Sequence, residues 1–315
     1  MKILAVGSAM PQRRVRNEEL ATFLDTSDEW IRTRTGIEER RVLSGDEKLE
    51  DLAFQAAQTA LSRAKLQARE LDYILCSNVV SEHITPGLGT IVQGLLGASC
   101  PSLDLNAACA GFIYALQVAQ GLLKSGSKTI LILCAEMNSR LCDWTDRRSC
   151  VLFGDGAAAA IVTSGGEDFL FQMTTQSNSS VLYAKNQPGN SPFQNPWQAE
   201  YLTMNGQEVY KFAVAAACKG IRSLLELAGL QTQSIRYFLI HQANLRIIQS
   251  VREKLGLDPS LFPTNIQRYG NTSSVSIPLL LEELFQSGEL KPGDQLVFSA
   301  FGAGLQTGCC LLSLA

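Results

Sequence analysis

Two kinds of apolar pattern alternate along this chain. Short continuous apolar runs, such as 130–134 and 295–299, are typical of buried strands. Longer stretches carry apolar residues at a spacing of three to four, which is typical of amphipathic helices, and two of them cover 112–123 and 277–285. The alternation predicts an α/β fold in which helices cover mixed sheets.

The pattern of the first half of the chain recurs in the second half. Residues 61–75 match residues 225–239 position by position, at an offset of 164 residues, including the pairs Ala64 and Ala228, and Tyr73 and Tyr237. Such self-similarity indicates an internal duplication. We predict two halves, 1–165 and 166–315, which pack against each other without a linker.

Cys109 is the first candidate for chemistry. It follows the short apolar strand 102–105, precedes the helical segment 112–123, and has only small neighbours. A cysteine at a helix start is exposed to unpaired backbone N–H groups, which favour the thiolate over the thiol. The alternative is a buried cysteine that serves packing alone. Potential catalytic partners elsewhere in the chain favour the interpretation of Cys109 as a nucleophile.

The companions of Cys109 are His241 and Asn271. His241 follows the apolar run 237–240 and begins a polar stretch. The other histidine of the chain, His83, has no candidate catalytic residues near it in the sequence. Asn271 lies in a Gly-Asn-Thr turn ahead of the helical segment 277–285, where an ordinary turn is the alternative. An offset similar to that of the repeat places Asn271 opposite Cys109. We expect the two strand-to-helix turns to meet at one site.

These motifs resemble a known family, the β-ketoacyl-acyl carrier protein synthases III of the thiolase-like condensing enzymes. The resemblance runs nearly from end to end. It is carried by Asp25-Thr-Ser-Asp-Glu-Trp-Ile31, Thr33-Arg-Thr-Gly-Ile37, Ala107-Ala-Cys-Ala-Gly-Phe112, Phe153-Gly-Asp-Gly-Ala157, Leu202-Thr-Met204, His241-Gln-Ala-Asn-Leu-Arg-Ile247, Gly270-Asn-Thr-Ser273 and Ala300-Phe-Gly-Ala-Gly304. It implies the thiolase-like fold, a five-layered αβαβα arrangement.

The resemblance also implies a reaction, the decarboxylative Claisen condensation of an acyl-CoA starter with malonyl-acyl carrier protein at the start of fatty-acid synthesis. Cys109 would accept the acyl group, and the backbone N–H groups of Cys109 and Ala303 would form the oxyanion hole. The thioester enolate that decarboxylation produces needs hydrogen-bond donors that are not strong acids. A neutral imidazole N–H of His241 and the amide of Asn271 meet that need.

The same family assigns residues to its two thioester substrates. Those expected to bind coenzyme A are Trp30, Arg34, Arg147 and Asn244. Trp and Arg offer flat faces for the adenine, and Arg adds charge for the phosphates. Lys211 and Arg246 match positions where the family meets its acidic carrier protein, although exposed basic residues are commonly only solvated surface. The resemblance implies no metal and no resident cofactor, since coenzyme A arrives as a thioester substrate.

Thr85 departs from the family pattern. It stands where well-studied members place a bulky Phe that closes the acyl pocket from the partner subunit of a homodimer. A smaller side chain would admit a longer or branched acyl group, so a condensing enzyme of specialised metabolism is the alternative function. Arg148 likewise stands where Gly is usual. A cysteine hydrolase would share Cys, His and Asn but leaves the motifs around Trp30 and Arg147 unexplained.

Composition limits the remaining function classes. The chain has 315 residues, 46% of them hydrophobic, and a net charge of -3 with no basic stripe, which argues against nucleic acid as a partner. The acidic pair Glu38-Glu39 precedes the basic pair Arg40-Arg41, which predicts a solvated face of mixed charge there.

Cysteine usage and hydropathy bear on location. Nine cysteines without a disulfide spacing pattern indicate a reduced, cytoplasmic protein. No apolar run reaches the length of a membrane span, and the first residues lack a signal sequence. The polar, proline-containing segment 177–200 is expected to form a mobile loop near the substrate entrance.

Overall fold

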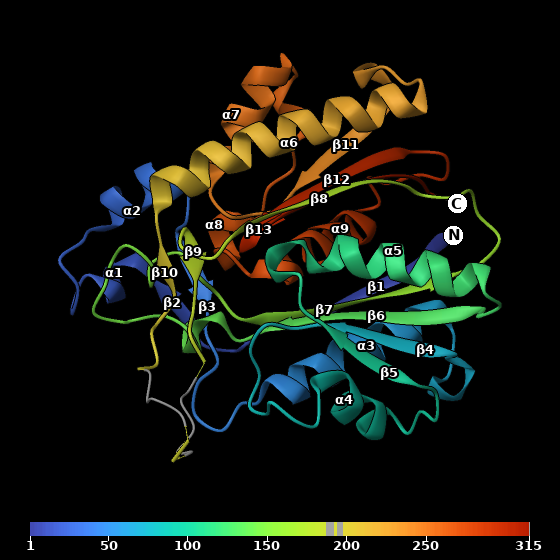
Figure 1. Ribbon diagram of the computed structural model, residues 1–315, viewed down its shortest axis with the longest axis horizontal. Helices are drawn as coiled ribbons and strands as arrows, with labels where there is room; N and C mark the ends of the chain where they lie inside the picture. Colours follow the sequence, from blue (N-terminus) through green and yellow to red (C-terminus); the bar gives the residue numbers. More distant parts are fainter. Residues whose placement is uncertain (187–191, 194–197, 315) are drawn as a thin grey trace.

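A computed structural model describes residues 1–186, 192–193 and 198–314 of the chain. Its helices and sheets stack in five layers, with a helical layer between two sheets and one further helical layer outside each sheet (Figure 1). The predicted αβαβα arrangement is therefore confirmed.

The N-terminal sheet has the strand order β1-β7-β6-β4-β5. Strands β4, β5 and β6 are parallel to one another, whereas β7 is antiparallel to both β6 and β1. Its outer face is covered by helices α3 and α4, and its inner face by α5 (Figure 1). The bounds are β1 Lys2–Ala9, α3 Leu49–Ala64, β4 Tyr73–Ser77, α4 Leu88–Leu96, β5 Ser102–Leu105, α5 Gly111–Lys124, β6 Thr129–Glu136 and β7 Gly156–Thr163.

The C-terminal sheet has the order β11-β12-β13-β8 and is also mixed, with β11 and β12 parallel and the other pairs antiparallel. Helices α6 and α7 lie outside it, and α9 lies between the sheets beside α5 (Figure 1). The bounds are β8 Leu170–Asn178, α6 Gly206–Ala228, β11 Ile235–Ile240, α7 Leu245–Leu255, α9 Ser276–Ser287, β12 Gln295–Gly302 and β13 Gly304–Ser313.

The repeat seen in the sequence is a repeat of structure. Helices α3 and α6 end 164 residues apart, at Ala64 and Ala228, and the strands that follow them, β4 and β11, carry Tyr73 and Tyr237. Each is a parallel strand of its own sheet. The proposed boundary after residue 165 falls between β7 and β8, the last strand of one sheet and the first of the other.

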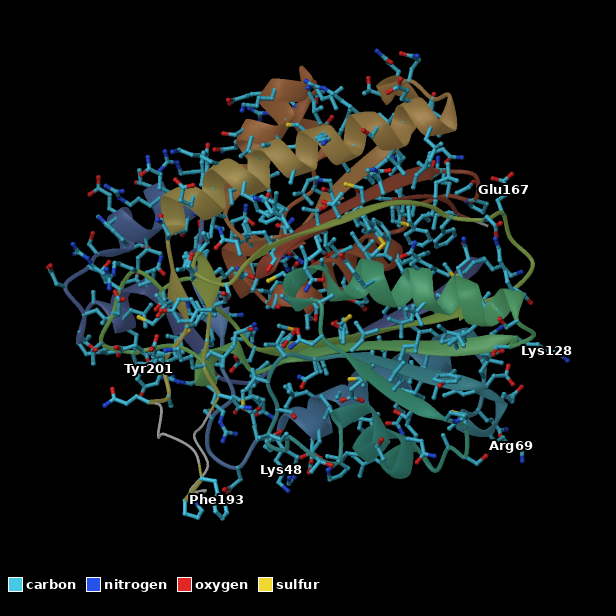
Figure 2. The ribbon with its side chains drawn as sticks, viewed as in Figure 1. Lys48, Arg69, Lys128, Glu167, Phe193 and Tyr201 are labelled. Atoms are coloured by element: carbon cyan, nitrogen blue, oxygen red, sulfur yellow. The ribbon has the colours of Figure 1, made fainter. Side chains whose placement is uncertain are left out.

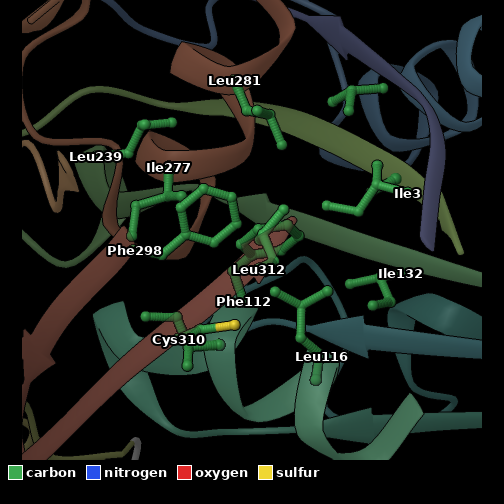
Figure 3. Close-up of a cluster of buried hydrophobic side chains, with 14 of the residues drawn as sticks. Ile3, Phe112, Leu116, Ile132, Leu239, Ile277, Leu281, Phe298, Cys310 and Leu312 are labelled. Atoms are coloured by element: carbon green, nitrogen blue, oxygen red, sulfur yellow. The ribbon is translucent and has the colours of Figure 1, made fainter. Parts of the chain in front are cut away.

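The central core lies between the two sheets. The inner helices α5 and α9 supply Phe112, Leu116, Ile277 and Leu281, and both sheets contribute to the same cluster (Figure 3). The Phe112 and Phe298 rings lie 6.1 Å apart, centroid to centroid. Burying side chains of this size stabilises the fold by about 2 kcal/mol each, so the middle layer holds the two halves together.

Shorter elements surround this core. Several of them, α1, α2, β2, β3, β9 and β10, gather at one end of the sheets (Figure 1). Their bounds are β2 Arg14–Arg16, α1 Asn17–Leu20, α2 Asp28–Thr35, β3 Glu39–Arg41, η1 Ala68–Glu70, η2 Ala108–Ala110, η3 Asn138–Arg140, β9 Leu182–Tyr183, β10 Thr203–Met204, η4 Thr232–Ser234, η5 Pro259–Leu261, α8 Ile266–Tyr269 and η6 Ser273–Val275.

Charged side chains cover the periphery, as Lys48, Arg69, Lys128 and Glu167 illustrate (Figure 2). Among the described residues, no helix combines the length and the apolar character that a membrane span requires. All nine cysteines are free thiols. The predicted loop 177–200 lies partly outside the described residues, at 187–191 and 194–197, and its mobility stays a prediction.

The predicted solvated face at Glu38 to Arg41 is wrong for Arg40. Its side chain is fully buried, and burial lowers the pKa of its guanidinium to about 10. The guanidinium donates hydrogen bonds to the main-chain oxygens of Val15 and Val151 at 3.2 and 2.8 Å, and to Asn17 Oδ1 at 2.8 Å. Arg40 therefore joins the N-terminal segments to the loop before β7. The prediction failed because it used only the neighbouring charges in the sequence, whereas the hydrogen-bond partners of Arg40 lie up to 111 residues away along the chain.

Candidate active site

Cys109 lies in the short 3-10 turn η2, between β5 and the first residue of α5. This is the strand-to-helix turn that the sequence predicts. Ala108, just before it, has a left-handed φ of +46°, which non-glycine residues rarely adopt and which marks a tightly determined turn. The tip of the hairpin between β12 and β13 closes on this turn, since a Cβ added at Gly302 would lie 2.8 Å from the Cys109 nitrogen. Only glycine at 302 permits this approach.

His241 follows directly on β11, and its ring is almost fully buried in a T-shaped contact with the Phe301 ring, 5.3 Å between centroids. Its Nδ1 lies 2.7 Å from the hydroxyl oxygen of Ser276, the first residue of α9. Burial lowers the pKa of the imidazole to about 3. His241 is therefore neutral at physiological pH, as the sequence-based mechanism requires.

Asn271 is held by both its backbone and its side chain. Its main chain pairs with the segment before β7, where the N–H bonds to Leu152 O at 2.8 Å and the C=O accepts from Gly154 N–H at 3.0 Å. Its Oδ1 accepts a hydrogen bond from Ser273 N–H at 2.9 Å. Because the amide oxygen is occupied, the side-chain NH₂ is the group left to act as a donor.

The two strand-to-helix turns are built alike, but their register differs from the sequence prediction. Asn106 Oδ1 accepts from Ala108 N–H at 3.1 Å, as Asn271 Oδ1 accepts from Ser273 N–H, and Ser273 has a φ of +54° beside the +46° of Ala108. Asn271 therefore corresponds to Asn106, and Cys109 corresponds to Ser274. The offset in this region is 165 residues rather than the value that placed Asn271 opposite Cys109, because loop lengths differ between the halves.

One cavity of about 970 Å³ collects most of the predicted site residues. The described residues that line it include the three candidate catalytic side chains, the candidate oxyanion residue and the candidate coenzyme A contacts: Cys109, His241, Asn271, Ala303, Trp30, Arg34, Arg147 and Asn244. Arg246 and Arg148 line it as well. Residues 179 and 182–184 of the predicted loop also border this cavity.

Two predicted residues lie away from the cavity wall. Lys211 is exposed on α6, where its Nζ lies 3.4 Å from Glu208 Oε1. Thr85 is exposed in the loop between β4 and α4. Its role in an acyl pocket stays a prediction.

The mouth of the cavity carries an aromatic ring between two cations. Trp30, on α2, has the guanidinium carbons of Arg34 and Arg147 at 5.2 and 5.1 Å from its ring centroid. Arg147 also donates to the main-chain oxygen of Asp25 and, at 3.1 Å, to its carboxylate. Asn244 caps α7 through its Oδ1 and donates to Arg34 O at 3.1 Å. Flat and cationic groups therefore line the entrance together.

The electrostatics of Cys109 differ from the sequence prediction. Burial raises the pKa of its thiol to about 12, although a hydrogen bond with Ser273 acts in the opposite direction. The negative charge of Glu136 raises this pKa further. Cys109 precedes the first residue of α5 by two positions, so desolvation outweighs the expected effect of a helix start. The thiol needs a group that takes its proton.

Comparison with known proteins matches this geometry to one family. A family model described as 3-oxoacyl-[acyl-carrier-protein (ACP)] synthase III matches residues 103–179, and the model of its C-terminal part matches residues 225–314. The β-ketoacyl-[acyl-carrier-protein] synthase III of Clostridium perfringens strain 13 is 44% identical over 321 residues, which cover 99% of each chain. The chain belongs to the β-ketoacyl-acyl carrier protein synthase III family. It is a condensing acyltransferase.

Solved structures share the fold. The synthase III of Thermus thermophilus superposes with a TM-score of 0.94 at 39% identity, over 100% of this chain and 99% of the other. The priming β-ketosynthase of the R1128 polyketide pathway superposes with a TM-score of 0.91 at 34% identity, over 99% and 96%. The thiolase-like fold expected from the sequence is thus confirmed.

Four residues at the site were missed by the sequence analysis as functional groups: Glu136, Ser273, Ser276 and Gly302. Ser273 and Gly302 lie inside motifs that carry the family resemblance, and their contacts with Cys109 appear only in three dimensions. Glu136 could have been found from the sequence, since a carboxylate at the end of an apolar strand is unusual and indicates a functional role.

Proposed function

We propose that this chain catalyses the decarboxylative condensation of an acyl-CoA starter with malonyl-acyl carrier protein, as an initiating enzyme of fatty-acid synthesis. The observation that carries the proposal is the meeting of Cys109, His241 and Asn271 at one cavity in a chain of the synthase III family. Cys109 comes from the turn before α5 in one half, whereas His241 and Asn271 come from the end of β11 and the turn before η6 in the other half. Each has surroundings that suit one step of the reaction.

The first step is acyl transfer to Cys109. The thiolate attacks the thioester carbonyl, and negative charge develops on the carbonyl oxygen. The backbone N–H groups of Cys109 and Ala303 are assigned to this oxygen, supported by the close approach of the chain at Gly302 to the Cys109 nitrogen. The role assigned to Ala303 does not depend on its side chain, because the donor is the backbone N–H.

The second step is decarboxylation of the malonyl group and attack of the resulting enolate on the acyl-cysteine. Neutral His241 and the Asn271 amide are assigned as donors to the enolate oxygen. The Ser276 hydroxyl has one hydrogen and two acceptors within reach, His241 Nδ1 at 2.7 Å and Ser273 O at 3.0 Å. Donation to Nδ1 fixes the tautomer that carries its proton on Nε2, so that Nε2–H can serve the enolate.

Coenzyme A is assigned to the mouth of the cavity, with its adenine between Trp30 and Arg147. Stacked flat groups are separated by about 3.5 Å, so an intervening adenine needs roughly 7 Å between them. The guanidinium of Arg147 now lies 5.1 Å from the ring, so it moves outward by about 2 Å. Its link to Asp25 is at the surface and offers little resistance. Arg34 and Asn244 complete the proposed contacts.

The carrier protein is assigned to the face that bears Lys211 and Arg246. Both are exposed, and Arg246 lies at the cavity while Lys211 lies along α6. Cations at the mouth of the cavity would guide an acidic carrier protein so that its malonyl arm enters the same cavity.

We also propose a homodimer in the cytoplasm. The edge strand β5 and the adjoining segments expose apolar side chains, among them Ile84, Leu95 and Leu103. An uncovered strand edge of this kind favours pairing with a second copy, and Thr85 lies in the same region. Nine free thiols suit a reducing compartment. Sedimentation equilibrium tests the dimer, and a monomer at micromolar concentration would refute it.

The experiment that tests the reaction is a panel of acyl-CoAs from acetyl to decanoyl, including branched chains. The protein is incubated with each, the mass added to Cys109 is read on the intact protein, and malonyl-acyl carrier protein is then supplied. We expect a short acyl adduct that is converted to a β-ketoacyl-acyl carrier protein. Cys109→Ser should give neither adduct nor product, and full activity in that variant would refute the proposal.

A second candidate is a condensing enzyme of specialised metabolism that uses the same Cys-His-Asn site on a longer or branched acyl donor. Thr85, where a bulky Phe is usual, favours it. A similar fold occurs in the priming β-ketosynthase of the R1128 pathway. Preferential acylation by long or branched acyl-CoA in the same panel would decide for this candidate.

A further inference from the structure

A carboxylate is buried directly behind the nucleophile. Glu136 ends β6, and its side chain is fully buried. Its oxygens accept hydrogen bonds from Val79 N–H at 3.0 Å, Ser274 O–H at 2.7 Å and Ser273 O–H at 3.3 Å. Among the described residues, the groups that act on its charge are neutral hydrogen-bond donors and not cations. A buried carboxylate held only by neutral donors can exchange a proton at little cost.

Ser273 connects this carboxylate to the nucleophile. Its hydroxyl oxygen lies 3.3 Å from Cys109 Sγ and 3.3 Å from Glu136 Oε1. A hydroxyl has one hydrogen, so it donates to only one of the two neighbours at a time. When Glu136 is ionised it can only accept, so Ser273 donates to Glu136 and the Cys109 thiol donates to Ser273. When Cys109 is the thiolate, both bonds reverse.

We propose that Ser273 and Glu136 form a proton relay for Cys109, in which the thiol proton passes through the Ser273 hydroxyl to the Glu136 carboxylate and returns at the end of the cycle. The proposal rests on the acyl transfer assigned above. Ser273 touches the reacting sulfur and is catalytic, whereas Glu136 acts through Ser273 and holds the proton.

The relay balances over the whole reaction. Cys109 S–H gives its proton to Ser273, which gives its own to Glu136, and the thiolate then displaces coenzyme A from the acyl-CoA. The coenzyme A thiolate takes a proton from water at the open mouth. After decarboxylation releases CO₂, the enolate attacks the acyl-cysteine and expels the Cys109 thiolate. The proton on Glu136 returns through Ser273 to the sulfur, which leaves one proton consumed overall.

The alternatives for a base are poor. His241 is neutral with a pKa lowered to about 3, so it is too weak a base to hold the thiol proton. Burial raises the pKa of Glu136 to about 7, close to the optimum for a group that accepts and returns protons at neutral pH. The titratable groups that face Glu136 are the thiols Cys76, Cys109 and Cys134. A Cys109 thiolate and a Glu136 carboxylate would repel each other at this distance. The site therefore favours states in which only one of the two groups is ionised.

The test compares Glu136→Gln and Ser273→Ala with the wild type between about pH 5 and pH 9. Cys109 is labelled with iodoacetamide, and separately with the preferred acyl-CoA, and both rates are followed by intact mass. In the wild type both rates should level off as Glu136 ionises. In both variants the rate at neutral pH should fall by about 10²-fold, the levelling should vanish, and the rate should climb with pH.

Ser274→Ala is the matched control. It removes a hydrogen bond to the same carboxylate but leaves the Ser273 bridge. The levelling should therefore move to higher pH, and at about pH 9, where Glu136 is mostly ionised in both proteins, its rates should stay within about threefold of wild type. If Glu136 acts only by repelling the thiolate, Glu136→Gln reacts faster than wild type, and the relay is refuted. An unchanged pH profile in Ser273→Ala refutes it too. Iodoacetamide needs no acyl-CoA, so failure of the proposed function alone leaves this test intact.

Discussion

Glu136→Gln should stabilise the folded protein at alkaline pH and lose that advantage in acid. The carboxyl has an ordinary pKa of 4.5, and burial raises it to about 7 in the folded state. Between these values the folded state binds the proton more tightly than the unfolded state, so the free energy of unfolding falls as pH rises from 4.5 to 7. Each pKa unit corresponds to about 1.4 kcal/mol, which gives a loss of about 3 kcal/mol. Glutamine, which does not ionise, avoids this loss.

Urea unfolding of wild type and Glu136→Gln at about pH 4.5 and about pH 8, at one protein concentration, measures the difference. The variant should gain about 3 kcal/mol relative to wild type between the two pH values. Other titrating groups are common to both proteins and cancel. Ser274→Ala should show the opposite sign, because the ionised carboxylate loses a donor worth about 2 kcal/mol at pH 8. A difference between Glu136→Gln and wild type that does not vary with pH would refute the reasoning.

Three further variants test the site. Gly302→Ala places a methyl group 2.8 Å from the Cys109 nitrogen, so acylation followed by intact mass should slow by about 10²-fold, and near-normal acylation would contradict the close approach. Arg147→Ala removes one face of the proposed adenine site, and steady-state kinetics should show KM for acyl-CoA about tenfold higher with kcat little changed. Ser276→Ala removes the hydrogen bond assigned to keep the His241 proton on Nε2. Condensation from pre-acylated enzyme should therefore slow about tenfold, while acylation stays within about threefold of wild type. Equal losses in both steps would show that Ser276 is only structural.

The sequence predicted the local features of the site well. Cys109 and His241 lie where apolar strands give way to helices, and Asn271 lies in the predicted turn, because hydrophobic periodicity and turn residues act over a few positions. The family resemblance then placed Trp30 and Arg147 together, and the structure brings them within 5.1 Å.

Features that depend on distant partners were not predicted. The burial of Arg40 follows from contacts with Asn17 and Val151, and neither is visible in its own charge pattern. The charge state of Cys109 depends on burial by both halves and on Glu136, so a rule based on the helix start alone gave the wrong direction. A duplication detected at one offset also fails to fix the register of a later turn once loop lengths diverge.

The two equivalent turns end in opposite chemistry. Each turn packs against a strand of the opposite half. The Cys109 turn lies beside β12, which ends in Gly302 and leaves the Cys109 nitrogen accessible at the cavity. The matching turn lies beside β6, which ends in Glu136, and the Glu136 carboxylate binds the hydroxyl and the backbone N–H of Ser274, the residue that corresponds to Cys109. A duplicated scaffold thus supports one reactive centre, and the second copy of the turn supplies the hydrogen bonds that hold the carboxylate which we expect to take the proton of Cys109.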